Sequence, residues 1–252
     1  MPNYSPEIRR LLYEDENGEV VGLDEVQLLD PVPTERIAPT RALLHSPDLY
    51  LVYQAALALT AWGDPAGLLQ IEAMIDARVD RRMEFAPHRI YDYDNVYDEM
   101  ADAVYIYGLS SDAQREDRLR VFRKLLALYG PCYFESKLKS ALLRMDLAGA
   151  LVPDMQAALE RAQGLGRLYL ASQMLPPLAR WEGEAARPLL DRFSAPPAKS
   201  DRAPDPRSNV AEALGYLPGL DSWRQLEQMA QSPERAVAEQ ARASLARLSR
   251  PR

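Results

Sequence analysis

The chain has 252 residues, of which 47% are hydrophobic and 27% charged, and its formal net charge is −7. Leu and Ala together supply 72 residues, whereas Val, Ile and Thr together supply 21, a ratio that favours helices over sheets. The acidic balance argues against general nucleic-acid binding, which needs a basic surface. A single cysteine, Cys132, excludes an internal disulfide and a cysteine-based zinc site.

We expect residues 1–45 to form an irregular, acidic N-terminal segment that contains Pro31, Pro33 and Pro39. Asn17-Gly18 lies between the apolar runs 11–13 and 20–21, which is typical of a β-hairpin turn. Glu14-Asp15-Glu16 is a poor strand, so an acidic loop fits equally well. The segment shows no secretory signal pattern, and no apolar run of the chain reaches membrane-spanning length, so we expect a cytoplasmic protein.

From Ser46 onward the pattern predicts one helix after another, in a domain over 46–252. Pro47-Asp48 is typical of a helix start, and Leu51, Leu59 and Trp62 share one apolar face. A second apolar stripe from Leu68 to Ile75 completes this first helix pair. Further pairs are predicted at 92–108 with 113–129, 134–146 with 151–163, 166–181 with 184–193, and 207–217 with 221–231, followed by a last helix at 233–248.

The helix pairs repeat in sequence. A shift of 186 residues places Ser46-Pro47 on Ser232-Pro233 and Gln54-Ala55 on Gln240-Ala241. Two-helix units of this size are the signature of an α-solenoid, because one pair cannot bury its own apolar face. The sequence therefore predicts an all-α fold: a right-handed α-solenoid of about five to six helix pairs.

The segments that begin at Ser46-Pro47-Asp48 and at Ser232-Pro233-Glu234 resemble HEAT-type repeats. The resemblance rests on the proline-and-acid start, the small residues in the first helix, and Gly63-Asp64 in the turn. It implies a HEAT-like solenoid. It is nearly silent on function, since such arrays are mostly binding scaffolds. The proline-rich stretch at about 195–206 is expected to be a loop between repeats, either a connector or a binding loop.

The sequence lacks the motifs and spacings that most enzyme chemistry requires. The two histidines, His45 and His88, have no metal-ligand spacing, and the pattern that begins at Asp92 lacks the glycine of a calcium loop. No nucleophile elbow or phosphate loop is present, so we expect no enzyme activity, no metal and no cofactor. A HEAT-like DNA glycosylase and a HEAT-like bilin lyase are the enzyme alternatives. The glycosylase would use a Trp and an Asp from among Trp62, Trp181, Trp223, Asp64, Asp191 and Asp221.

The strongest local signal is an acidic and tyrosine-rich segment at 90–107, which holds five of the 13 tyrosines. Asp94, Asp98 and Asp102 are spaced to share one helix face, where their charges oppose each other. This segment could be a solvated helix face with packed tyrosines, or a surface that binds a basic partner. The candidate partner-binding residues are Tyr91, Asp92, Tyr93, Asp94, Tyr97, Asp98, Glu99 and Asp102.

These features predict a non-enzymatic protein-binding scaffold that is monomeric when free and binds neither nucleic acid nor membrane. The chain looks like the HEAT-type immunity proteins of bacterial polymorphic toxin systems, which implies a toxin with a basic surface as partner. Another adaptor or regulatory scaffold is the alternative within the same class. If the acidic segment is not the contact, residues of the second helices, such as Gln70, Arg115 and Gln156, form the alternative binding face.

Overall fold

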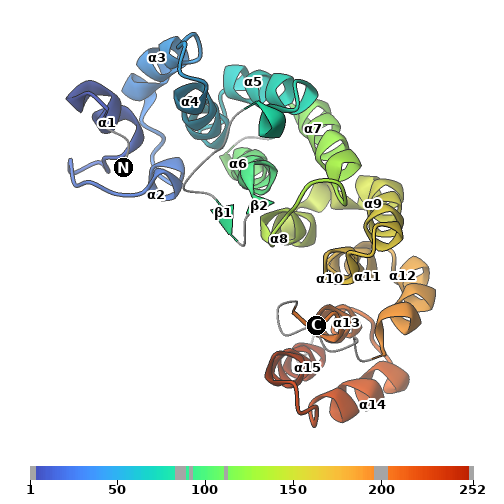
Figure 1. Ribbon diagram of the computed structural model, residues 1–252. Helices are drawn as coiled ribbons and strands as arrows, with labels where there is room; N and C mark the ends of the chain where they lie inside the picture. Colours follow the sequence, from blue (N-terminus) through green and yellow to red (C-terminus); the bar gives the residue numbers. More distant parts are fainter. Residues whose placement is uncertain (1–3, 83–88, 91–92, 111–112, 196–203, 250–252) are drawn as a thin grey trace. The chain divides into compact units, whose positions relative to one another are not determined.

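The computed structural model describes residues 4–82, 89–90, 93–110, 113–195 and 204–249. The chain forms two compact units, Met1–Leu125 and Leu126–Arg252. Helices dominate both units, which confirms the all-α class (Figure 1). The described strands are β1 (Arg89–Ile90) and β2 (Tyr93–Asp94), which pair antiparallel with each other.

The first unit is organised around α4 (Leu49–Ala61). This helix contacts α2 (Leu23–Gln27), α3 (Thr34–Leu43), α5 (Pro65–Asp76) and α6 (Val96–Ser110). All its residues from Leu51 to Ala61 are buried, as expected for a helix that is apolar nearly all round. The unit also contains α1 (Pro6–Leu12), the 3-10 turn η1 (Val79–Arg81) and most of α7 (Arg115–Leu128).

The N-terminal segment is more regular than expected, because α1, α2 and α3 occupy much of residues 1–45. Leu12 and Val26 are fully buried in one apolar cluster with Leu59 and Trp62 of the α4 region. The indole N–H of Trp62 donates to the backbone carbonyl of Val26 over 3.0 Å. Helices this short are unstable alone, so packing on α4 is what holds them. The segment therefore belongs to the first unit.

The Asn17-Gly18 sequence forms a tight turn with a single antiparallel bridge between Glu14 and Val20. Gly18 has a φ of +82°, which glycine adopts without strain. The Asp15 carboxylate accepts hydrogen bonds from the backbone N–H groups of Asn17 and Glu19, both over 2.8 Å. The segment therefore combines features of both predicted alternatives, because it is an acidic loop that contains a hairpin-like turn.

The second unit consists of helices whose alternate members pack on one another. α11 (Leu175–Trp181) contacts α9 (Val152–Gly164) and α13 (Arg207–Leu214), and α13 contacts α15 (Arg235–Leu248). The remaining helices are α8 (Lys137–Arg144), α10 (Leu168–Ser172), α12 (Gly183–Leu190) and α14 (Leu220–Met229), with 3-10 turns η2 (Asp146–Leu151) and η3 (Asp191–Phe193). The helix predicted at 166–181 is divided in two, because Pro176 and Pro177 cannot continue α10 and instead occupy the first turn of α11.

The sequence repeat has a local structural counterpart at two helix starts. Ser46 Oγ accepts the backbone N–H of Asp48 over 3.1 Å before α4, and Ser232 Oγ accepts that of Glu234 over 3.2 Å before α15. Asp48 then caps α4 through its side chain, whereas Glu234 makes no such bond. The Ser-Pro-acid motif thus precedes a helix with the same serine hydrogen bond in both units, whereas the side-chain cap is present only before α4.

Two further expectations concern long apolar helices and the proline-rich loop. No helix in the described ranges has the length and apolarity needed to cross a bilayer. Of the proline-rich stretch at about 195–206, residues 196–203 lie outside the described ranges.

Candidate functional site

The acidic and tyrosine-rich segment is not the exposed helix face that its spacing predicts. Helix α6 begins only at Val96, so Asp94 lies in β2 and does not share a helix face with Asp98 and Asp102. Tyr97 and Asp98 are fully buried, while Glu99 and Asp102 are partly buried. Tyr91 and Asp92 lie outside the described residues, and only the backbone of Tyr93 and Asp94 is described.

The start of α6 is buried because it packs against α4 and bonds to the residues around it. Tyr53 of α4 donates its hydroxyl to the carbonyl of Val96 over 3.2 Å, and the Tyr97 hydroxyl donates to the Asp80 carboxylate. Tyr97 and Asp98 are therefore not available to a partner in this conformation. The structure favours the packing interpretation for Tyr97, whereas both interpretations expected Asp98 to be exposed and it is buried. The binding role of the other residues stays a prediction.

The negative charge of the protein lies in the first unit. Met1–Leu125 holds 23 acidic and 13 basic side chains, a formal charge of −10, whereas Leu126–Arg252 holds 14 acidic and 17 basic, a charge of +3. A field concentrated in this way attracts cationic partners and speeds their association. The first unit therefore carries the acidic field of the chain.

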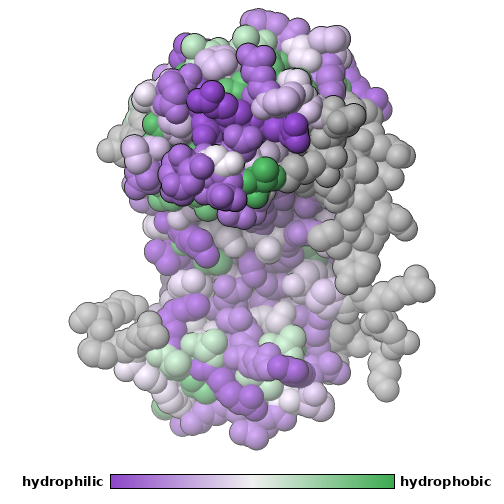
Figure 2. Space-filling model, turned by 90° about the vertical axis from the view of Figure 1, so that its left-hand side faces the viewer, coloured by the Kyte–Doolittle hydropathy of each residue, from purple (hydrophilic) through white to green (hydrophobic). Residues whose placement is uncertain are grey.

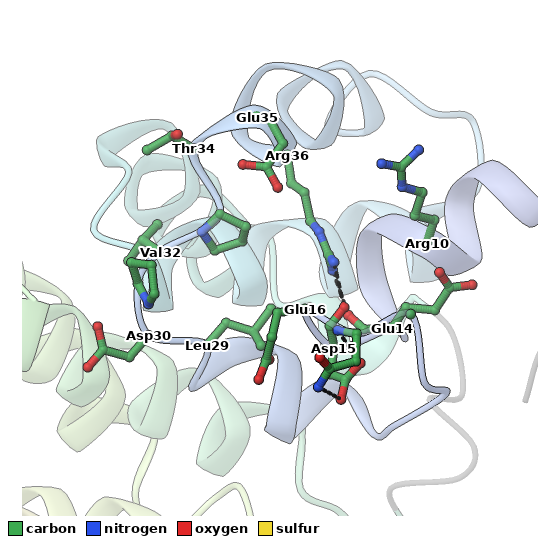
Figure 3. A pocket seen from close by; sticks show the side chains of 14 residues that line it. Arg10, Glu14, Asp15, Glu16, Leu29, Asp30, Val32, Thr34, Glu35 and Arg36 are labelled. Atoms are coloured by element: carbon green, nitrogen blue, oxygen red, sulfur yellow. Dashed lines mark hydrogen bonds between the residues drawn. The ribbon is translucent and has the colours of Figure 1, made fainter.

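The first unit contains a hollow of about 620 Å³ between the Asn17-Gly18 turn, the end of α1 and the start of α3 (Figure 3). Its polar lining is dominated by carboxylates, and its apolar lining comes from the segment between α2 and α3. We call this the acidic hollow; it is lined by Arg10, Glu14, Asp15, Glu16, Asn17, Gly18, Leu29, Asp30, Pro31, Val32, Pro33, Thr34, Glu35 and Arg36.

Arg36 builds the hollow and does not neutralise it. Its side chain is 9% exposed and reaches from α3 to the turn (Figure 3), where it donates to the backbone carbonyls of Glu14, over 2.6 Å, and Asp15, over 2.8 Å. A guanidinium has a fixed fork of donors that suits two neighbouring acceptors. The Arg36 guanidinium is hydrogen-bonded to backbone carbonyls and is not free to pair with the five carboxylates of the lining. Arg10 is therefore the only exposed cation of the lining.

The carboxylates of the hollow differ in what they do. The backbone N–H of Glu19, followed by those of Asn17 and Gly18, lowers the pKa of Asp15, which holds this carboxylate charged within the turn. Glu16, Asp30 and Glu35 are exposed. No group of three His, Cys, Asp or Glu side chains in the described ranges could hold a metal ion. What the exposed acids can do is pair with the Lys or Arg side chains of another molecule.

Two large apolar side chains are exposed close in sequence to the acidic hollow. Val20 follows the turn and is 58% exposed, and Leu28 at the end of α2 is 62% exposed. Figure 2 shows a mostly hydrophilic surface over the upper part of the molecule, where the N-terminal helices lie, with few apolar side chains among the polar ones. Apolar contacts among carboxylates are what a basic, partly apolar protein segment would use.

Two of the six candidate residues of the glycosylase alternative, Trp62 and Asp64, have structural roles. Trp62 is 5% exposed and hydrogen-bonded to Val26, and Asp64 is 4% exposed and caps α5 through the N–H of Ala66. Neither side chain lines an open surface. Comparison with protein-family models, curated proteins and solved structures found no match.

The sequence indicated part of this site. The excess of acids in residues 1–36 is visible in the sequence, as is the Asn-Gly turn. The sequence could not show which acids face a common hollow, because that depends on how α1 and α3 pack on α4. The role of Arg36 had no sequence signal, since it bonds to carbonyls 21 and 22 residues away.

Proposed function

We propose that this protein is a non-enzymatic binding scaffold and that the acidic hollow receives a basic segment of a partner protein. The observation that carries the proposal is the set of exposed carboxylates in a hollow whose buried arginine bonds only to backbone carbonyls. Such a field accelerates encounter with a cationic surface, and the neighbouring Val20 and Leu28 add apolar contact area.

The HEAT-like architecture is part of the proposal. Consecutive helices pack as pairs, such as α4 with α5 and α14 with α15, and alternate helices pack on each other within each unit. The shared Ser-Pro-acid helix start supports a repeat. Stacked pairs leave long exposed surfaces, which is why repeat arrays so often serve as binding scaffolds.

Within this class we favour an immunity protein that neutralises a bacterial toxin in the cytoplasm. The resemblance to HEAT-type immunity proteins and the acid-rich first unit support this choice, since many basic targets can be blocked by an acidic surface. An adaptor or regulatory scaffold would use the same hollow. A growth assay distinguishes the two, because only a toxin arrests growth when it is produced alone.

The first experiment locates the contact. A photo-crosslinking amino acid is placed at Leu28, which precedes the lining residue Leu29 in the sequence, and in a second variant at Leu165, which is similarly exposed at 55% but lies in the other unit. We expect a partner protein to be captured at position 28 and not at 165 in cells of the source organism. Equal capture at both positions, or capture at 165 alone, would contradict the proposal.

The second experiment tests the charge. The triple variant Glu16→Gln, Asp30→Asn, Glu35→Gln removes three exposed acids of the hollow, and Glu184→Gln, Asp221→Asn, Glu227→Gln makes the same charge change on exposed sites of the second unit. The hollow variant should bind the captured partner at least about tenfold more weakly at low salt, with a smaller difference at high salt. The control variant should bind as the unaltered protein does. Equal losses in both would mean that only net charge matters.

A further inference from the structure

The second unit carries a cluster of opposite character, formed by two arginines and two aromatic rings from three different elements. Arg180 and Trp181 end α11, Tyr216 follows α13, and Arg247 lies near the end of α15. The Arg180 guanidinium carbon lies 5.1 Å from the centre of the Trp181 ring system and 5.8 Å from that of Tyr216. The Arg247 guanidinium carbon lies 4.3 Å from the centre of the Tyr216 ring. We call these four residues the arginine–aromatic cluster.

The cluster is held in place by contacts on each side. The indole N–H of Trp181 donates to the carbonyl of Leu142 over 2.7 Å. A Cβ atom built on Gly215 would lie only 3.0 Å from Nη1 of Arg247, so the guanidinium packs closely against this glycine. Trp181, Tyr216 and Arg247 are partly exposed, and Arg180 is exposed. The arrangement is therefore both ordered and accessible.

The two arginines of the cluster have no counter-ion among the described residues. Three other cations of the same unit do have one: Lys139 pairs with Glu212 at 2.8 Å, Arg207 with Asp205 at 2.6 Å and Arg235 with Glu239 at 2.7 Å. Arg180 and Arg247 form no such pair within the described ranges, and the buried Nη1 of Arg247 has no hydrogen-bond acceptor there. An aromatic ring stabilises a cation but accepts few of its N–H groups. The buried Nη1 cannot be reached from solvent, so the donors open to a partner are those of the exposed Arg180 and of the exposed part of the Arg247 guanidinium.

We propose that the arginine–aromatic cluster binds carboxylates of an acidic segment of a partner protein. A guanidinium and a carboxylate form paired, charge-assisted hydrogen bonds, and both arginines contact one tyrosine ring, so neighbouring acids of one segment can reach them together. Arg, Trp and Tyr are also the side chains that contribute most to protein interfaces. The site is independent of the acidic hollow, which would repel such a segment.

A nucleic acid fits this cluster less well. Single strands are bound by stacking bases on open aromatic faces beside a cationic groove. Here guanidinium groups already lie over the Trp181 and Tyr216 rings. The unit has a formal charge of only +3 in a chain of −7, which provides little of the counterion release that phosphate backbones need.

The test uses the full chain and an uncharged-end hexaglutamate peptide, titrated calorimetrically at about 0.15 M salt, where exposed long-range charges are screened. The test variant is Arg180→Gln with Arg247→Gln. Its matched control is Arg187→Gln with Arg224→Gln, two exposed arginines of the same unit that have an acid three residues earlier, at 3.8 and 3.9 Å. Hexaglutamine, inorganic phosphate and a single-stranded oligonucleotide complete the comparison.

We expect hexaglutamate to bind and hexaglutamine not to bind, with at least a tenfold weaker affinity in the test variant and less than a twofold change in the control. The hollow variant with Glu16, Asp30 and Glu35 replaced should bind hexaglutamate at least as well as the unaltered chain. Should the double variant fail to fold, Arg247→Lys replaces it, since it keeps the charge but loses the paired donors, and several-fold weaker binding is expected. Unchanged affinity in these variants overturns the proposal. So does binding of phosphate or of the oligonucleotide that is stronger than binding of hexaglutamate and is lost in the same variant.

Discussion

The buried carboxylate of Asp64 joins two helices, because it accepts Nε of Arg41 over 2.9 Å and the backbone N–H of Ala66 over 2.9 Å. Arg41 is in the last turn of α3, and Asp64 is the N-cap of α5. One side chain thus starts α5 and fastens the N-terminal helices beside it. The acidic hollow depends on this placement of α3, since Arg36 lies one and a half turns earlier on the same helix.

Replacing Asp64 should separate the two roles of this carboxylate. Asp64→Ala removes the cap and the ion pair and should lower the free energy of unfolding by about 1–3 kcal/mol. Asp64→Asn keeps a side-chain oxygen for capping and should cost less than about 1 kcal/mol, because the half-exposed Arg41 can bond to water instead. Urea denaturation measures both values. Equal losses in the two variants would show that the ion pair, and not the cap, carries the effect.

The link between α5 and α7 should depend on pH. Glu72 accepts hydrogen bonds from Arg120 over 2.7 and 2.8 Å and pairs with Lys124, and the Arg120 bonds in particular lower its pKa to about 2. A carboxyl group whose pKa is lowered by folding stabilises the folded state at any pH above its pKa in the unfolded chain. This contribution is lost as the pH falls toward 2. Glu72→Gln should therefore destabilise the protein by about 1 kcal/mol near neutral pH.

The difference between Glu72→Gln and the unaltered protein should shrink between about pH 4.5 and 2 and vanish below it. Urea denaturation across this range measures it. Glu184→Gln serves as the control, since Glu184 is 90% exposed and its nearest cation, Arg187, is 3.8 Å away. A difference for Glu72→Gln that stayed constant down to pH 2 would argue against the ion-paired arrangement.

Arg36 should control the order of the Asn17-Gly18 turn. Arg36→Lys keeps the charge but cannot donate to two carbonyls in a fixed geometry. The backbone N–H groups of Glu19 and Val21, which bond within the turn, should exchange with solvent about tenfold faster in this variant. Arg10→Lys is the matched control on the exposed side of the same hollow. Protection that is equal in both variants would mean that the turn orders itself without Arg36.

Two Gly→Ala changes should have opposite effects. At Gly67 in α5 an added Cβ would lie 2.5 Å from the backbone nitrogen of Thr60 and 2.7 Å from Cβ of Leu59, so Gly67→Ala should destabilise the protein by about 1–3 kcal/mol. At Gly164, the last residue of α9, nothing lies within 4 Å, and Gly164→Ala should stabilise by about 0.5–1 kcal/mol. Thermal unfolding distinguishes the two. A neutral Gly67→Ala would mean that α4 and α5 can move apart without cost.

Tyr97 should behave as a core residue whose hydroxyl makes a partly buried hydrogen bond. Tyr97→Phe removes only the hydroxyl that donates to Asp80 and should cost about 0.5–1.5 kcal/mol. Tyr97→Ala also empties space under α4 and should cost about 3–5 kcal/mol. Denaturation of both variants measures this. A loss of partner binding in Tyr97→Phe at unchanged stability would return this tyrosine to the contact surface.

The sequence by itself determined the helical class and most helix positions. The predicted helices at 113–129, 151–163 and 233–248 match α7, α9 and α15 within two residues at each end. These helices have apolar stripes at helical spacing and clear breakers, and both signals are local. The Ser-Pro-acid starts at Ser46 and Ser232 were visible for the same reason, because their hydrogen bonds join residues two positions apart.

Only the tertiary structure decided which of the polar residues are exposed. The sequence allowed Tyr97 to be packed or exposed and gave no reason to bury the carboxyl group of Asp98; packing of α6 against α4 buries both. The same packing gives residues 1–45 their short helices, which are too short to form alone. The acidic hollow and the arginine–aromatic cluster likewise join side chains from separate elements. Burial and such long-range contacts depend on how elements meet, and a one-dimensional pattern of hydrophobicity and charge does not contain that information.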